Sequence, residues 1–218
     1  TINYQFGATG WGTTFGGLPV APLGQPPFVS TAFSPNDIAV LRVQDNTGVL
    51  TNVSVGLFLD EYATNGSFVQ EIAISTNGAN ALVVSGDAVA EVSLTRALNG
   101  RWLCFSGYHA PVGVLNIPGT SSLQYPRELA TVDVFGNFSV ISANTHFFNG
   151  LTIRGAVSDG TNNFWAIGAI SGISVGGLDY YGYDAAAATV YSQNIRVANL
   201  VNGRLYLGTS SGGGIYEF

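Results

Sequence analysis

One phrase occurs three times along this chain and limits the possible folds more than any other feature. Each copy carries an arginine, then an Asn-Gly or Asp-Gly turn, then an apolar run rich in aromatic residues. The copies are SLTRALNGRWLCFSGYHA from Ser93, TIRGAVSDGTNNFWAIGA from Thr152 and NIRVANLVNGRLYLGTSSGG from Asn194. Repeats spaced roughly 40 to 60 residues apart and built from short strands are typical of propellers, because one small sheet cannot bury its faces until neighbours stack on it. The sequence therefore predicts an all-β fold, a β-propeller or part of one, with about four to five blade-like units of antiparallel strands.

The composition agrees with this fold class. The 218 residues include 29 glycines and 12% aromatic residues but only 9% charged residues, which is typical of short strands joined by tight turns. A chain of this length can bury the core of one domain. Its net charge of −6 disfavours nucleic acid or an anionic membrane surface as a partner. No apolar run is long enough to span a bilayer.

Residues 1–36 differ from the rest of the chain. This segment holds five of the eight prolines and many glycines, so it indicates extended stretches and turns. We expect a Gly/Pro-rich segment over 1–36, one strand of which pairs with the last strand of the chain and closes a ring. Residues 37–218 are expected to form the β-propeller blades.

Strand and turn signals become regular from Ile38. Asn-Gly and Gly-Asn pairs between β-rich runs predict hairpins around Gly66, Gly100 and Gly136. A further hairpin is expected between ALVVSG and AEVSLTR. DAAAATVY is the one stretch with some helical character, and its flanks favour a strand and a loop. The repeated units are expected to begin near Ile38, Val92, Ile153 and Ile195.

The fourth unit is shorter than the others and ends at Phe218. Propellers have 4 to 8 blades of about 40 to 50 residues, so the chain suffices for a small closed ring or forms the first part of a larger one. The abrupt last unit favours the second arrangement. We then expect a second chain, a carboxy-terminal fragment or a homo-oligomer to complete the fold, because an open propeller exposes an apolar terminal face.

The order of the phrases resembles a known family. FLDEYATNGSFVQEI, NALVVSG, SLTRALNGRWLCFSGYHA, ATVDVFGNFSV, IRGAVSDGTNNFWAIG and IRVANLVNGRLYLG follow one another over about residues 38–218. This order is similar to that of exported β-propeller proteins, found mainly in bacteria and often bearing a C-terminal Pro-Glu-Pro sorting signal. The resemblance implies a propeller, an extracellular or cell-surface location, and a match to the amino-terminal portion of longer members. It implies no reaction.

Arginines are the first candidates for a binding site. Arg96, Arg154 and Arg196 occupy matching positions of the repeat, and Arg42 also lies in a strand-like context. If these strands are innermost in their blades, the guanidinium groups line a central channel and bind carboxylate, sulfate or phosphate. Alternatively, each arginine pairs with an acid or with carbonyls of the neighbouring blade, as a structural clamp that repeats with the blade.

Tyrosines and acids supply the other candidates. The cluster LDYYGYD from Leu178 predicts an exposed loop in which Asp179, Tyr180 and Tyr181 contact a sugar ring. Trp102 and Trp165 are expected in the core. The neighbours Asp60 and Glu61 point to opposite faces of a strand, so we expect one to pair with an arginine and the other to be solvated.

No spacing typical of a catalytic or metal site is present. His109 and His146 are the only histidines and lack a zinc-binding spacing, and DGTNN from Asp159 is expected to be an ordinary turn. Cys104 lies in an apolar run and is expected to be a buried, inert thiol. We expect no metal and no cofactor. Three N-x-S/T sequons predict possible glycosylation at Asn52, Asn65 and Asn137.

These observations favour an extracellular, non-catalytic β-propeller that acts as a binding or structural module, for a carbohydrate or an anionic ligand. The alternative is a secreted propeller-fold glycosidase or lyase. Such an enzyme would use a channel carboxylate, for example Asp60 or Asp179, together with an arginine. Two carboxylates about 5 to 10 Å apart in a central pocket would favour the enzyme.

Overall fold

The computed structural model describes residues 2–5, 14–15, 18–23, 32–44, 48–171, 176–181, 188–210 and 214–218. Over these residues the protein is all-β, with several antiparallel sheets, two single-turn 3-10 helices and no α-helix. The expected fold class is confirmed at this level. The chain divides into two compact units, Thr1–Thr31 and Ala32–Phe218.

The first unit contains three described strands, β1 (Ile2–Gln5), β2 (Thr14–Phe15) and β3 (Leu18–Leu23). Strand β3 pairs in parallel with β1 and antiparallel with β2. The second unit begins at Ala32, and its first residues bond to later parts of the same unit. The Phe33 N–H donates to the Val134 carbonyl over 2.8 Å, and the Ser34 N–H donates to Glu61 over 2.6 Å.

The first half of the second unit holds two antiparallel sheets and a two-stranded ladder. The first sheet contains β4 (Ile38–Val43), β6 (Leu57–Tyr62) and β7 (Phe68–Ala73). The ladder joins β5 (Ser54–Val55) to β8 (Val84–Ser85), and η1 (Gly78–Asn80) lies between β7 and β8. The second sheet contains β9 (Thr95–Arg96), β10 (Trp102–Tyr108), β11 (Arg127–Asp133) and β12 (Phe138–Asn144), with η2 (Ile117–Gly119) between β10 and β11.

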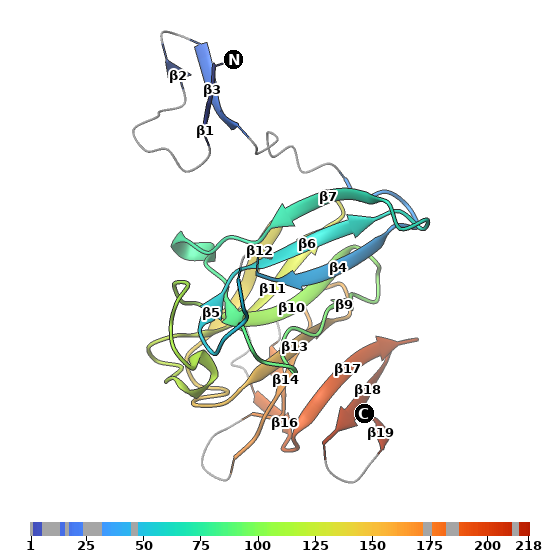
Figure 1. Cartoon of the computed structure of the whole chain (residues 1–218). Coiled ribbons are helices and arrows are strands. Elements are labelled where there is room, and N and C mark those ends of the chain that lie inside the picture. Colours follow the sequence, from blue (N-terminus) through green and yellow to red (C-terminus); the bar gives the residue numbers. More distant parts are fainter. Residues whose placement is uncertain are drawn as a thin grey trace. The chain divides into compact units, whose positions relative to one another are not determined.

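Two further antiparallel sheets follow. The third contains β13 (Ile153–Ser158), β14 (Phe164–Gly168), β15 (Leu178–Tyr181) and β16 (Ala188–Tyr191). The fourth contains β17 (Ile195–Val201), β18 (Arg204–Thr209) and β19 (Ile215–Glu217). In the second, third and fourth sheets each strand neighbours the next along the chain (Figure 1). The four sheets begin at Ile38, Thr95, Ile153 and Ile195, close to the expected starts of the repeated units.

The expected Asn-Gly and Gly-Asn hairpins form at each predicted turn. Strands β6 and β7, β9 and β10, and β11 and β12 are antiparallel neighbours. The repeat phrase also closes the hairpin of β17 and β18, where Asn202 and Gly203 have φ angles of +52° and +78°. A type I′ turn needs positive φ at both central residues, which is why Asn-Gly is favoured there.

ALVVSG and AEVSLTR do not form the expected hairpin, so this prediction is wrong. Strand β8 pairs with β5 instead, and Val83 exchanges backbone hydrogen bonds with Tyr108. The segment after β8 is held by Glu91, whose carboxylate accepts from the Ser85 N–H over 3.0 Å and from the Tyr108 hydroxyl over 2.8 Å. The Glu91 side chain thus accepts the hydrogen bond from the Ser85 N–H that a hairpin partner would have accepted.

Three apolar clusters lie between successive sheets. Leu59 and Phe105 belong to the cluster that joins the first and second sheets, and Leu129 and Ala156 to the one that joins the second and third. The third and fourth sheets meet in a cluster that contains Leu178 and Leu207. Consequently β11 and β13 are buried on both faces, whereas β17 alternates between buried and exposed residues. The described core is a series of sheets that pack face to face.

Cys104 lies in the cluster between the second and third sheets and is fully buried, as expected. Burial raises the pKa of its thiol to about 12, so the thiolate that reacts with disulfide reagents is scarce. We expect no labelling of the native protein by a thiol-reactive disulfide reagent, and one thiol per chain after unfolding in urea. Labelling of the native protein at the unfolded rate would contradict this burial.

Candidate functional site

Arg96 lines two hollows in the second unit. The larger has a volume of about 580 Å³ and is bordered by the segment before β4, the turn between β9 and β10, and the end of β11. The smaller, about 390 Å³, lies between residues 96–100 and Asn199 and Leu200 of β17. Ala39 of β4 lines the larger hollow, so residues from the first strands of the first and fourth sheets line the two hollows that Arg96 borders.

The turn between Arg96 and Arg101 is held by two hydrogen bonds of the Asn99 side chain, one within the turn and one to the third sheet. The Asn99 side chain accepts from the Arg101 N–H over 3.0 Å and donates to the Gly160 carbonyl. A Cβ at Gly160 would lie 2.0 Å from the Asn99 side chain, and its φ is +87°, so only glycine fits there. The third sheet thus fixes the turn that presents both arginines.

Both guanidinium groups are available to a ligand. Arg96 and Arg101 are exposed, and the Arg96 contacts with the Gly100 carbonyl are long, at 3.4 Å. Arg101 makes no side-chain hydrogen bond to another described residue of the unit. Charge-assisted donors of this kind bind carboxylate, sulfate or phosphate in a bidentate manner.

The remaining lining of the larger hollow is mixed. Trp102 is half-buried and stacks on Phe164, with the ring centroids 6.0 Å apart. Asp37 and Asp133 contribute carboxylates to the wall. Asp133 accepts hydrogen bonds from the Phe135 and Asn137 N–H groups and from the Asn137 side chain, so its own turn occupies it. The hollow therefore offers two cations, an aromatic ring and one less engaged acid.

The other two repeat arginines do not line these hollows. Arg154 is buried, and its Nη1 donates to the Asn194 side chain and, over 2.9 Å, to the Ile195 carbonyl. Burial lowers the pKa of Arg154, and the nearby charge of Arg196 lowers it further. Arg154 thus joins the third sheet to the fourth, as the clamp alternative predicts. Arg196 is exposed at the start of β17.

The prediction of an exposed tyrosine loop is wrong for the residues of it that the structure describes. Asp179, Tyr180 and Tyr181 lie in β15, between β14 and β16, and Asp179 is fully buried. Tyr181 packs edge-on against Phe147, whereas Tyr180 donates from its hydroxyl to Asn163. The flanking strands and the neighbouring sheets cover these side chains. Tyr183 and Asp184 fall outside the described residues.

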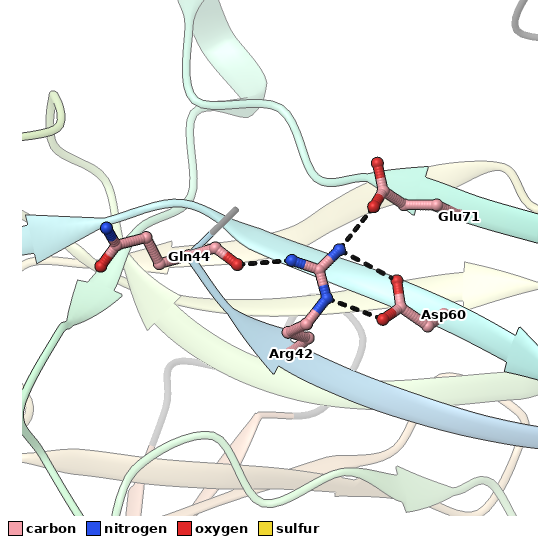
Figure 2. A network of polar contacts seen from close by, with 4 residues as sticks. All are labelled: Arg42, Gln44, Asp60 and Glu71. Atoms are coloured by element: carbon pink, nitrogen blue, oxygen red, sulfur yellow. Dashed lines mark hydrogen bonds and ion pairs between the residues drawn. The ribbon is translucent and has the colours of Figure 1, made fainter. Parts of the chain in front are cut away.

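Asp60 is held by an arginine of the adjacent strand (Figure 2). Arg42 donates from Nε to Asp60 over 2.7 Å, from Nη2 to Asp60 over 3.2 Å and to Glu71, and from Nη1 to the Gln44 carbonyl over 2.6 Å. Its guanidinium carbon also lies 4.6 Å from the centre of the Phe58 ring. The carboxylate proposed for catalysis is therefore committed to a cation within its own sheet.

The expectation that the neighbour of Asp60 is solvated is wrong. Glu61 points to the opposite face, as predicted, but is fully buried there. It accepts hydrogen bonds from the Ser34 N–H and from the Gln70 side chain, which replace the water that a buried carboxylate loses. The Ser34 N–H comes from a segment 27 residues earlier that the local sequence did not connect to β6, whereas Gln70 lies opposite Glu61 in the predicted hairpin.

Sequence reasoning missed a buried polar group around β11. Arg127 is buried and donates to four backbone carbonyls, while Glu128 contacts Nδ1 of His109 over 2.9 Å. No local signal marks these residues, because only the stacking of sheets buries both faces of β11. The position of Arg101 directly after a turn could have been predicted, since the tripeptide Asn-Gly-Arg occurs twice, at 99–101 and 202–204.

The other sequence candidates are placed as follows. Asn52, Asn65 and Asn137 are all exposed, and glycosylation there stays a prediction. The Asp159 carboxylate accepts hydrogen bonds from Thr161 and Asn163 within its turn. Among the described residues, no three His, Cys, Asp or Glu side chains gather in a metal-binding group, and no helix has the length and apolarity to cross a membrane. Comparisons with known protein families, curated proteins and solved structures found no match.

Proposed function

We propose that the second unit is a β-propeller, or part of one, and that it acts as an extracellular, non-catalytic binding module. Its ligand is an acidic carbohydrate, bearing carboxylate or sulfate groups, that occupies the hollows beside Arg96. Three features support the propeller: successive antiparallel sheets, apolar clusters between them, and residues of β4 and β17 that line the two hollows bordered by Arg96. The extracellular location rests on the family resemblance.

One observation carries the choice of ligand. The exposed residues Arg96 and Arg101 and the half-buried Trp102 line a hollow of about 580 Å³. Arginine forks match carboxylate and sulfate groups, and an aromatic ring provides an apolar face for a sugar. Asp60 and Asp179, the carboxylates of the enzymatic alternative, line neither hollow.

Binding is expected to depend on both arginines. Isothermal titration with sulfated, uronate-containing and neutral oligosaccharides should detect only the acidic ones, with affinity that falls as salt is added. Replacement of Arg96 and Arg101 by methionine removes hydrogen bonds to charged groups worth about 1.5 to 3 kcal/mol each, so affinity should fall at least tenfold.

The matched control is Arg204→Met. Arg204 is an exposed arginine that pairs with Glu217 and lines neither hollow. Its replacement should leave binding unchanged. Equal affinity of the wild type and the Arg96/Arg101 double variant, or no binding of any acidic saccharide, would overturn the proposal.

A further inference from the structure

The two hollows beside Arg96 adjoin each other. Arg96 and Gly100 are the two described residues that line both of them. The Arg96 guanidinium lies against Gly100, where a Cβ would be only 2.6 Å from Nη2 of the arginine. The Gly100 carbonyl also accepts long hydrogen bonds from Nε and Nη2 of this side chain. One cation is therefore placed against the stretch of backbone that the two hollows share.

The smaller hollow differs from the larger one in charge. Arg96 is the one cation among the described residues that line it, and none of them is acidic. Leu98, which is 43% exposed, contributes apolar surface. Asn199 is exposed, and its Oδ1 accepts from the Leu200 N–H over 2.9 Å, while its NH2 group bonds to no other described residue. An amide donor and an apolar surface suit the hydroxyl groups and the ring of a neutral sugar unit.

The sizes of the hollows allow each to hold a part of one ligand. Volumes of about 580 and 390 Å³ both lie within the range of small-molecule sites, about 300 to 1,000 Å³. Two separate anionic ligands would compete for the same guanidinium and repel each other. A single ligand with one anionic group at Arg96 avoids this repulsion and contacts the walls of both hollows.

We propose that the two hollows are two subsites of one binding site. Arg96 and Arg101 bind the anionic group of a sugar unit that lies beside Trp102 in the larger hollow. The smaller hollow takes a neutral sugar unit linked to the first, where Asn199 donates to a hydroxyl group and Leu98 packs against the ring. This inference rests on the proposed function, and it narrows the ligand to saccharides in which an acidic unit is joined to a neutral one.

Isothermal titration with two pairs of probes tests the second subsite. One pair is galactose 4-sulfate and neocarrabiose 4-sulfate, and the other is glucuronate and cellobiouronate. The disaccharide of each pair adds one neutral sugar unit and no charge. For at least one pair, the wild type should bind the disaccharide about tenfold more tightly than the monosaccharide, with one ligand per chain.

Two variants fill the smaller hollow. Asn199→Trp and Leu98→Trp each place a large ring there, since both residues line this hollow and neither lines the larger one. In each variant the ratio of the two affinities should fall from about ten to about one. Ile215→Trp is the matched control, because Ile215 is exposed in the same sheet as Asn199 but lines neither hollow, so the ratio should keep its wild-type value. Circular dichroism checks that every variant keeps its fold.

The outcomes separate this inference from the proposed function. A wild-type ratio near one for both pairs, two monosaccharides bound per chain, or an unchanged ratio in both filled variants would overturn the second subsite while acidic saccharides still bind. Absence of binding by all four probes would overturn the inference too, and with it the proposed function if the longer acidic saccharides also fail to bind.

Discussion

Replacement of Arg127 by methionine is expected to lower the free energy of unfolding by about 3 to 5 kcal/mol, a large share of the stability of an ordinary domain. The Arg127 side chain is 1% exposed. It donates to the carbonyls of Tyr125 over 2.7 Å, Pro118 over 2.9 Å and Thr120 over 2.8 Å. Methionine keeps the volume but leaves these buried acceptors without a donor.

The same replacement removes an electrostatic partner. The Arg127 guanidinium lies 5.0 Å from the centre of the Tyr108 ring, and its charge offsets part of the rise in the pKa of Glu91 that burial causes. Three of its hydrogen bonds reach residues 118–125, in the long connection between β10 and β11. Loss of Arg127 should therefore release this connection as well as weaken the core between the second and third sheets.

Urea unfolding measures the first effect, and limited proteolysis within residues 109–126 measures the second. Arg101→Met is the control, since this exposed arginine makes no side-chain hydrogen bond to another described residue. Surface changes of this kind usually alter stability by less than about 0.5 kcal/mol. An Arg127→Met protein with the wild-type urea midpoint and protease pattern would show that the buried hydrogen bonds contribute little.

The local parts of the fold could be predicted from the sequence because they depend on neighbouring residues. An Asn-Gly pair adopts positive φ at small cost, so the turn at Asn202 and Gly203 and the hairpin that it joins follow from four or five residues. The starts of the sheets were predictable for the same reason. Each begins where a turn gives way to an alternating or apolar run.

The long-range parts could not be predicted, because they depend on which surfaces meet. Strand β8 pairs with β5, about 30 residues earlier, and the Glu91 side chain accepts from the N–H of Ser85, the last residue of β8. Asp179 was expected in an exposed loop, yet it lies in β15, between β14 and β16, and is fully buried. The residue types around a position do not show which distant strands will bury it.

The three repeat arginines illustrate the same limit within one motif. They occupy equivalent positions of the phrase but have different surroundings. Arg154 meets the backbone of the next sheet, Arg96 meets a hollow, and Arg196 meets solvent. The repeated phrase determines the position of each arginine on its strand. The neighbouring sheet determines whether the guanidinium binds backbone carbonyls or stays exposed.

Stability is expected to fall as the pH rises from the weakly acidic to the weakly basic range. Burial raises the pKa of Glu128 to about 8, of Glu91 to about 7 and of Asp179 to about 6. A raised pKa means that the folded state holds a proton that the unfolded chain releases at lower pH. These groups therefore stabilise the fold fully below their unfolded pKa values, 4.5 for the glutamates and 3.8 for the aspartate, and this contribution is lost as the pH rises through the folded values.

Glu128 should contribute most of this dependence. Its side chain is fully buried, its Oε1 contacts Nδ1 of His109, and its Oε2 has no hydrogen-bond partner. When protonated, the Glu128 carboxyl group is neutral, and when ionised it is a buried charge with one unsatisfied oxygen. One pKa unit corresponds to about 1.4 kcal/mol, so the loss is on the order of a few kcal/mol.

Urea unfolding of the wild type at several pH values between those unfolded and folded pKa values should give midpoints that decrease steadily. Glu128→Gln keeps the shape of the side chain but carries no titrating proton, so its midpoint should fall less over the same range and exceed that of the wild type at the basic end. Asp87→Asn, a change at an exposed carboxylate, should follow the wild-type slope. A wild-type midpoint that stays constant or rises with pH would contradict the burial of these carboxyl groups, and a Glu128→Gln slope equal to that of the wild type would assign the effect to Glu91 and Asp179 instead.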